Sequence, residues 1–357
     1  MFKKKLTVPP SVFAICVFVL CIVAGLWLKD SFFTRNRVTK SVYFWKNTFD
    51  ITTKDSAFLN QMGIDKVYCK LMDVDWSPVH HAFPASQTRI YKTTQLRQQF
   101  VPVVFITNRT MQYCTDYEVT ELAQKLWSKI TLLKKDYKID EIQLDCDWTE
   151  STRKKYFNLI RALKEISATK VSVTIRLHQY KYRSRTGIPP ADRGMLMCYN
   201  IDDIKNIKTV NSIYTEKEAL KYFTVKSPYP LELDFALPSF SWGVLFSRGE
   251  FKAIIDEWDE TTLNQRTYIT PIGDNRYQIT EDIVLQRPEA FNDIYLRNGD
   301  IIRYENIDKE ALISSASVAH HALNNNTPAV AFFSYDTLTI KTFGLDTYEK
   351  VYSTFVW

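Results

Sequence analysis

Two carboxylates and an amide alternate along one predicted strand, within the stretch Ile139–Glu150 (IDEIQLDCDWTE). Because the side chains of a strand alternate between its two faces, Gln143, Asp145 and Asp147 share one face and their apolar neighbours share the other. A strand buried on both faces normally reads as a continuous apolar run, and an unpaired buried charge is costly or shifts its pKa. Chains tolerate such groups mainly where they act on something. We therefore place the candidate active site here.

This strand belongs to a longer alternation of strands and helices. Eight strands are predicted, at Val42–Trp45, Lys66–Met72, Val101–Ile106, Glu141–Asp147, Lys170–Leu177, Met195–Tyr199, Leu231–Leu237 and Pro328–Phe333. Helices are predicted at Ser56–Met62, Tyr117–Leu133 (with Asp116 as its cap), Ser151–Ile166, Lys309–Leu323 and Tyr348–Phe355. Eight strands alternating with helices indicate an α/β fold, a (β/α)8 TIM barrel. An open doubly wound sheet usually has a glycine-rich first turn, and this chain has only 9 glycines.

A long segment, residues 238–327, separates the seventh predicted strand from the eighth. Segments of this length without structure of their own are uncommon in compact domains. We therefore predict a small α+β insertion at about residues 243–308, containing a helix at Glu250–Trp258 and a hairpin around Pro271–Asn275.

Barrels of this kind carry their sites where the carboxyl ends of the strands meet. The residues predicted to act catalytically there are Asp147, Asp145 and Tyr199. Those predicted to bind substrate are Gln143, Asn200, Trp45, Arg176, His178, Trp242 and Asp73. Such a mixture of carboxylates, cations, amides and aromatic rings suits a neutral polyol. The sequence shows no phosphate-binding loop and no metal-ligating cluster of His and Asp, so neither a metal nor another cofactor is expected.

The strand with the two carboxylates resembles the fourth-strand signature of the chitinase-like glycoside hydrolase family 18, D-G-x-D-x-D-x-E. Asp140 and Asp145 match the first and third Asp, Glu141 and Gln143 replace the Gly and the second Asp, and Asp147 stands at the catalytic Glu. This is the most specific of the matches that the sequence offers.

Three further segments resemble that family in part. Met197–Asn200 (MCYN) is similar to its M-x-Y-D, Ala236–Trp242 (ALPSFSW) to its G-x-P-x-Y-G, and Ala331–Asp336 (AFFSYD) to its last strand, with Phe or Ser in place of the usual Trp. The insertion also falls where many chitinases carry theirs. The resemblance covers most of the chain from about residue 41, and it extends to uncharacterised bacterial families related to these enzymes, for which no activity is implied.

The resemblance implies a role for each matched residue. Asp147 would be the general acid, and Asp145 would orient a substrate 2-acetamido group that attacks the anomeric carbon in place of an enzyme nucleophile. Tyr199 would hydrogen-bond the acetamido oxygen, and Asn200 would support the carboxylate pair. The expected substrate is therefore a glycan, with an N-acetylhexosamine beside the bond that is cleaved.

Asp147 is one methylene shorter than the glutamate of the family. Either the backbone compensates for the shorter reach, or one of three alternatives holds. The protein could bind or scaffold a glycan without cleaving it. It could use another carboxylate, such as Asp73 or Asp336. Asp145 and Asp147 could also form a structural network with Arg176.

The first 28 residues read as a membrane anchor or signal segment. Met1–Lys5 is basic, and Ser11–Leu28 runs for 18 residues without a charge, close to the ~20 residues that span a bilayer. An uncleaved anchor is favoured over a cleaved signal, since no A-x-A-like site follows. A lipoprotein anchor at Cys21 is the less favoured alternative, because Leu20 is bulky. A linker (29–40) would lead to a barrel (41–357) on the exported, periplasmic or extracellular side.

Composition limits the remaining choices. The net charge of +6 is modest and no Arg-rich arm is present, so a nucleic-acid partner is not expected. Cysteines outside the first 28 residues form no C-x-x-C pair, which argues against a zinc site or a disulfide framework. We expect them to be buried small hydrophobes; they are Cys69, Cys114, Cys146 and Cys198.

Overall fold

The computed structural model describes residues 37–91, 95–224, 227–256, 258–286, 293–324, 327–335 and 342–356. The predicted anchor, Ser11–Leu28, lies outside these residues. Within the described ranges, no helix has both the length and the apolar character needed to cross a bilayer. The barrel and its insertion belong to one compact unit, Val38–Phe355.

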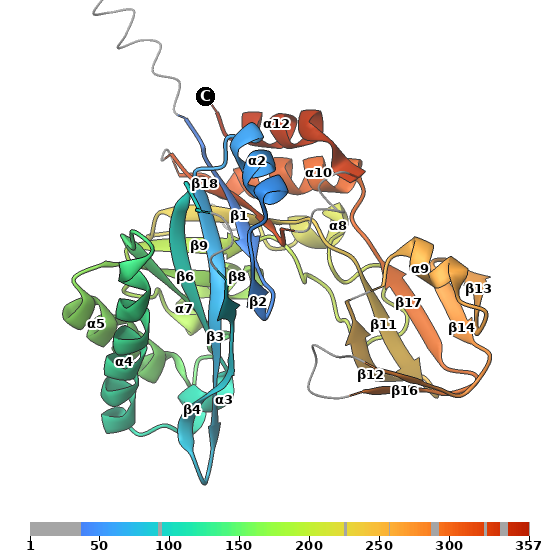
Figure 1. Ribbon diagram of the computed structural model, residues 1–357, viewed down its shortest axis with the longest axis horizontal. Helices are drawn as coiled ribbons and strands as arrows, with labels where there is room; N and C mark the ends of the chain where they lie inside the picture. The colour runs from blue at the N-terminus through green and yellow to red at the C-terminus, as the bar shows by residue number, and fades with distance from the viewer. Residues whose placement is uncertain are drawn as a thin grey trace, which may run out of the picture. The chain divides into compact units, whose positions relative to one another are not determined.

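Eight parallel strands close into a barrel, which confirms the predicted TIM-barrel architecture (Figure 1). The ring closes because β1 pairs with both β18 and β3. The strands, in their order around the barrel, are β1 (Thr39–Phe44), β3 (Lys66–Ser77), β6 (Gln99–Ile106), β7 (Glu141–Asp145), β8 (Lys170–Arg176), β9 (Arg193–Met197), β10 (Leu233–Pro238) and β18 (Ala329–Phe333).

Five of the six predicted helices are present, as α2 (Thr53–Gln61), α4 (Asp116–Thr131), α5 (Arg153–Ser167), α10 (Lys309–Ala319) and α12 (Leu345–Ser353). Shorter elements are α3 (Asn108–Tyr113), α6 (Leu177–Lys181), α7 (Arg183–Thr186), α8 (Glu216–Leu220) and two 3-10 turns, Leu132–Lys135 and His320–Ala322.

The start of α4 differs from the prediction by one residue. Thr115, and not Asp116, is the N-cap. Its hydroxyl accepts a hydrogen bond from the Glu118 amide, and the Glu118 carboxylate accepts one from the Thr115 amide. This reciprocal capping box satisfies two of the amides left open at the helix start, which a single Asp cap would not do.

Strand β3 is longer than predicted. It continues beyond Met72 to Ser77 and turns into the antiparallel strand β4 (His81–Gln87). A hairpin thus takes the place of the helix that would ordinarily connect β3 to β6. A separate short pair is formed by β2 (Thr48–Phe49) and β5 (Arg89–Ile90). The carboxylates of Asp73 and Asp75 interrupt the apolar pattern without ending the strand.

The insertion contains a five-stranded antiparallel sheet in the order β12–β11–β17–β14–β13. These strands are β11 (Trp242–Ser247), β12 (Glu250–Ile255), β13 (Ile269–Gly273), β14 (Arg276–Ile279) and β17 (Ile301–Glu305); α9 (Glu260–Gln265), β15 (Ile283–Leu285) and β16 (Ile294–Leu296) complete it. Leu245, Ile279 and Ile302 belong to its own hydrophobic core.

The prediction of a helix at Glu250–Trp258 is wrong. Residues Glu250–Ile255 form strand β12, which pairs antiparallel with β11. The turn between them has Arg248 at φ 53° and Gly249 at φ 82°. Two consecutive residues with positive φ make the tight hairpin turn that matches the twist of paired strands. Pairing with β11 therefore overrides the helix-like spacing of the apolar residues.

The lower interior of the barrel holds buried charges that are fully paired. Glu141, at the start of β7, accepts hydrogen bonds from Lys66 Nζ at 2.8 Å and Ser172 Oγ at 2.7 Å. Asp234, at the start of β10, pairs with Arg193 at 2.7 Å. Buried charges are retained where such partners satisfy them. These charged groups at the base of the barrel are therefore satisfied by one another.

Candidate active site

Asp145 is the last residue of β7 and is almost completely buried, with 2% of its surface exposed. Thr174 on β8 donates a hydrogen bond to its Oδ1 at 2.6 Å. Burial raises the pKa of Asp145 to about 6; nearby Arg176 and the Thr174 hydrogen bond oppose the rise, and the charge of Asp147 adds to it. Asp145 therefore holds a proton far more readily than an ordinary aspartate does.

Asp147 lies two residues beyond the end of β7 and is held by an arginine. Arg176, at the end of β8, donates from Nε to Oδ1 at 2.5 Å and from Nη2 to Oδ2 at 3.3 Å. Burial lowers the pKa of Arg176, but the charges of Asp147 and Asp145 outweigh burial and the net shift is upward. The guanidinium thus stays charged. A two-point contact of this kind fixes both the geometry and the charge of the carboxylate.

Aromatic rings from several strands gather at the same end of the barrel. Tyr199, just after β9, stacks on Phe333 of β18 with ring centroids 4.9 Å apart. Phe333 also contacts Trp45, which follows β1, at 5.5 Å. Phe240 meets Tyr199 at 5.7 Å and Trp242 at 5.1 Å. All but Tyr199 are partly exposed. Together these five rings form what we call the rim cluster.

The Tyr199 hydroxyl is buried and has no hydrogen-bond partner among the described residues. Buried hydroxyl groups are normally hydrogen-bonded, and an unpaired one is costly. Burial raises the pKa of Tyr199 well above its usual value, so the phenol keeps its proton and remains a donor. A bound molecule that offers an oxygen to this hydroxyl would satisfy it.

Two carboxylates in the second half of β3 are already paired. Asp73 accepts a hydrogen bond from Lys70 Nζ at 3.2 Å, and the same ammonium lies 5.8 Å from the centre of the Trp45 ring. Arg109 is the main cause that lowers the pKa of Asp75 to about 2. Asp73 therefore lies close to the rim cluster but is neutralised by Lys70. Asp336, the other alternative carboxylate, lies outside the described residues.

The remaining predicted site residues lie at different depths. Gln143 is fully buried below Asp145, where its Oε1 accepts from the Tyr43 hydroxyl and its Nε2 donates to Ser172 at 3.3 Å. This places Gln143 in the barrel interior and not at the surface of the rim. His178 and Asn200 are exposed, on α6 and directly after Tyr199.

Four residues of the site were not predicted: Lys70, Thr174, Phe240 and Phe333. Thr174 and Arg176 occupy alternating positions on β8, as Gln143 and Asp145 do on β7. This spacing predicts that both side chains point into the barrel, so Thr174 could have been proposed. Phe333 occupies the segment where the resemblance leads one to look for Trp, so its ring could have been proposed. Lys70 carries no such signal, because its contacts with Asp73 and Trp45 arise from the closed barrel.

Within the described ranges, no group of three or more His, Cys, Asp or Glu side chains could hold a metal ion. The cysteines Cys69, Cys114, Cys146 and Cys198 are buried, as predicted.

Comparisons with known proteins agree with the barrel. No family model and no curated protein matches the chain. A chitinase from Chromobacterium violaceum superposes with a TM-score of 0.50 and 11% identity, over 88% of this chain and 98% of the chitinase. The Bacillus cereus spore cortex-lytic enzyme SleL (TM-score 0.48, 12% identity, 90% and 75% covered) and a GH113 β-1,4-mannanase (0.42, 9%, 90% and 98%) are also similar.

At such identities a likeness shows the fold alone. The chain has a TIM barrel similar to that of a chitinase. The resemblance seen in the sequence is thus confirmed at the level of the fold.

Proposed function

We propose that this protein binds a glycan at the carboxyl ends of its barrel strands without cleaving it. The observation that carries the proposal is the ion pair between Asp147 and Arg176. A general acid must hold a proton and pass it to the leaving oxygen. Protonating Asp147 would break its two-point contact with Arg176, so the residue at the position of the family's acid is poorly placed to act as one.

The rim cluster supports binding. Sugar rings present apolar faces and polar edges, and aromatic side chains offer large rigid faces with few rotatable bonds. Trp45 and Phe333 are partly exposed and in contact with each other. The Tyr199 hydroxyl and the Asp147 carboxylate add a donor and an acceptor nearby. Such a set recognises an uncharged saccharide.

Hydrolysis beside an N-acetylhexosamine, with Asp147 as the general acid, is the second candidate. It is favoured by Asp145, whose pKa of about 6 allows it to hold a proton next to a second carboxylate. The unpaired Tyr199 hydroxyl would suit an acetamido oxygen. This candidate requires that substrate binding release Asp147 from Arg176.

One experiment separates the two candidates. Chitin oligosaccharides and peptidoglycan fragments are titrated into the wild type and into Asp147→Asn, with affinity measured by calorimetry and released sugar by chromatography. We expect both proteins to bind and neither to release sugar. Asp140→Asn, which changes an exposed aspartate just before β7 at the other end of the barrel, is the matched control. Release by the wild type that is lost only in Asp147→Asn establishes hydrolysis, and absence of binding by all three refutes both candidates.

We also propose that Ser11–Leu28 anchors the protein in a membrane with the barrel exported. The motivating observation is the charge-free run of 18 residues behind a basic start. The full chain should sediment with membranes, and its barrel should be cut by protease added from outside. A chain without residues 1–28 should be soluble. Recovery of the full chain in the soluble fraction would contradict the anchor.

A further inference from the structure

Glu305, at the end of β17, is the centre of a buried polar network in the insertion. Its side chain is completely buried, and three donors converge on it. Arg303 Nε donates to Oε1 at 2.6 Å, whereas Ser212 Oγ and Trp242 Nε1 donate to Oε2 at 2.6 Å and 2.8 Å. We call Ser212, Trp242, Arg303 and Glu305 the Glu305 network. A buried carboxylate with this many donors is strongly ordered.

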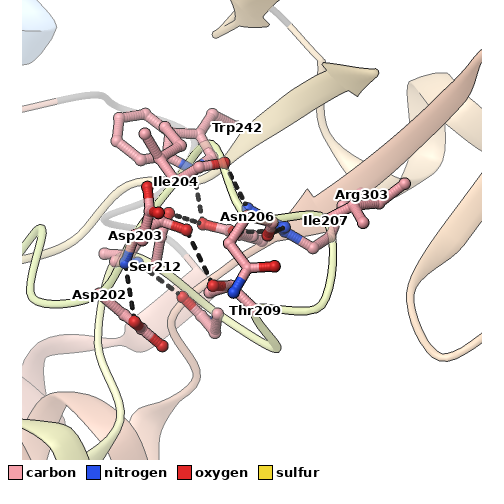
Figure 2. A network of polar contacts seen from close by, with 12 residues as sticks. Asp202, Asp203, Ile204, Asn206, Ile207, Thr209, Ser212, Trp242 and Arg303 are labelled. Atoms are coloured by element: carbon pink, nitrogen blue, oxygen red, sulfur yellow. Dashed lines mark hydrogen bonds and ion pairs between the residues drawn. The ribbon is translucent and has the colours of Figure 1, made fainter. Parts of the chain in front are cut away.

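The cation of this network is equally well satisfied. Arg303 is 0% exposed, and besides Glu305 it donates to the carbonyl oxygens of Asn206 at 2.7 Å and Ile204 at 3.0 Å (Figure 2). Its guanidinium also lies over the ring of Phe246, 5.0 Å from the centre. Ile204 and Asn206 belong to the β9–α8 loop, residues 198–215. The insertion therefore reaches this loop through an arginine with no exposed surface.

The β9–α8 loop leads directly back to the rim cluster. The amides of Asn200 and Ile201 donate to the carbonyls of Ile213 and Ser212 at 2.8 Å and 3.0 Å, which joins the two ends of the loop. Tyr199 precedes this pairing. A shift of Ser212 would thus be passed to the backbone beside Tyr199.

Trp242 provides the second connection. Its indole N–H is bonded to Glu305, and its ring meets Phe240, which in turn meets Tyr199 and Phe333. Glu305 is therefore connected to the rim cluster in two ways. It is hydrogen-bonded directly to Trp242, which is one of the five rings, and it is linked to Tyr199 through Ser212 and the β9–α8 loop. Among the described residues, no other buried carboxylate accepts hydrogen bonds both from a ring of the rim cluster and from the β9–α8 loop.

We propose that Glu305 is a positioning residue, which fixes Trp242 and the β9–α8 loop against each other and so makes the insertion part of the glycan site. Ion pairs of the barrel base such as Asp234–Arg193 hold the fold together, whereas Glu305 sets the position of a rim ring. The part of this inference that concerns affinity rests on the proposed glycan binding. The part that concerns Trp242 does not.

The test is Glu305→Gln in the full chain. A glutamine has one carbonyl oxygen for three donors and leaves Arg303 without its counter-charge. Acrylamide quenching of the Trp242 fluorescence, isolated by subtracting Trp242→Phe in the same background, should increase. Affinity for a chitin oligosaccharide should fall by about tenfold, the effect of one unmade buried hydrogen bond.

Two further variants keep the test decisive. Ser212→Ala removes one donor but keeps the charge pair, so it should change quenching and affinity in the same direction by less, even if Glu305→Gln folds poorly. Asp234→Asn likewise removes a buried carboxylate that pairs with an arginine, Arg193, but at the other end of the barrel. It should leave the quenching of Trp242 unchanged. Unchanged quenching in both Glu305→Gln and Ser212→Ala, or an equal change in Asp234→Asn, overturns the proposal. If the wild type binds no saccharide, the proposed function fails while a change in quenching still supports the positioning role.

Discussion

Replacing Asp145 by asparagine should stabilise the protein, and more so at high pH. Asp145 is buried, and its pKa is raised from 3.8 to about 6. The folded state therefore binds more protons than the unfolded state between these values, so stability is lost as the pH rises through this window. Asparagine carries no charge at any pH, and its oxygen can still accept the hydrogen bond from Thr174.

The size of the effect follows from the shift. A difference of two pKa units corresponds to about 3 kcal/mol at pH 8, where both states are ionised. At pH 4 the same carboxyl is largely protonated in the folded protein and the loss is below about 1 kcal/mol. Asp145→Asn should therefore raise the free energy of unfolding by up to about 3 kcal/mol at pH 8 and by little at pH 4.

Urea unfolding at pH 4 and pH 8, followed by circular dichroism, measures this difference. Asp147→Asn is the control with the opposite sign, because it leaves the guanidinium of Arg176, whose side chain is 19% exposed, without its partner and should destabilise the protein at pH 8. An Asp145→Asn variant that is less stable than the wild type at pH 8, or equally altered at both pH values, would refute the reasoning. In that case Asp145 would be held charged by its neighbours.

Three further variants of the site have expected outcomes. Arg176→Met should raise the pKa of Asp145 above about 6, because Arg176 opposes the rise; carboxyl NMR titration measures it, and a lower pKa would contradict it. Tyr199→Phe should leave the free energy of unfolding within about 1 kcal/mol of the wild type, since the hydroxyl has no partner among the described residues. The same variant should weaken glycan binding in calorimetry, and unchanged binding would remove the hydroxyl from the site. Trp45→Ala should weaken binding by about tenfold, whereas the exposed Tyr295→Ala in the insertion should not.

The barrel could be predicted because its determinants are local. The apolar run Val101–Ile106 indicates a buried strand, and the apolar residues on one face of Asp116–Thr131 indicate an amphipathic helix. Both patterns are contained within a few residues of sequence. The β12 strand could not, since Phe251, Ile254 and Ile255 fit a helical spacing as well as a strand. This segment is a strand because it pairs with β11 across a turn in which Arg248 and Gly249 have positive φ. The pairing is made only in the folded chain, so the apolar spacing alone does not reveal it.

The same limit applies to the site. Alternation along β7 was enough to place Gln143 and Asp145 on one side, whereas Asp147 lies beyond the end of the strand. It did not distinguish their depths, because that depends on how the neighbouring strands pack. Pairing of Asp147 with Arg176, 29 residues away, was one of three alternatives left open, and the structure realises the ion pair. Glu305 gave no signal, since two of its three donors, Ser212 and Trp242, come from distant parts of the chain.

A structure with a chitin oligosaccharide bound tests the central claim most directly. We expect a sugar ring on Trp45 and Phe333, a sugar oxygen within hydrogen-bond distance of the Tyr199 hydroxyl, and Arg176 still paired with Asp147. A saccharide bound elsewhere, for example in the hollow lined by His81 and Glu118, would contradict the location of the site. An Asp147 carboxyl released from Arg176 and facing the glycosidic oxygen would contradict binding without cleavage.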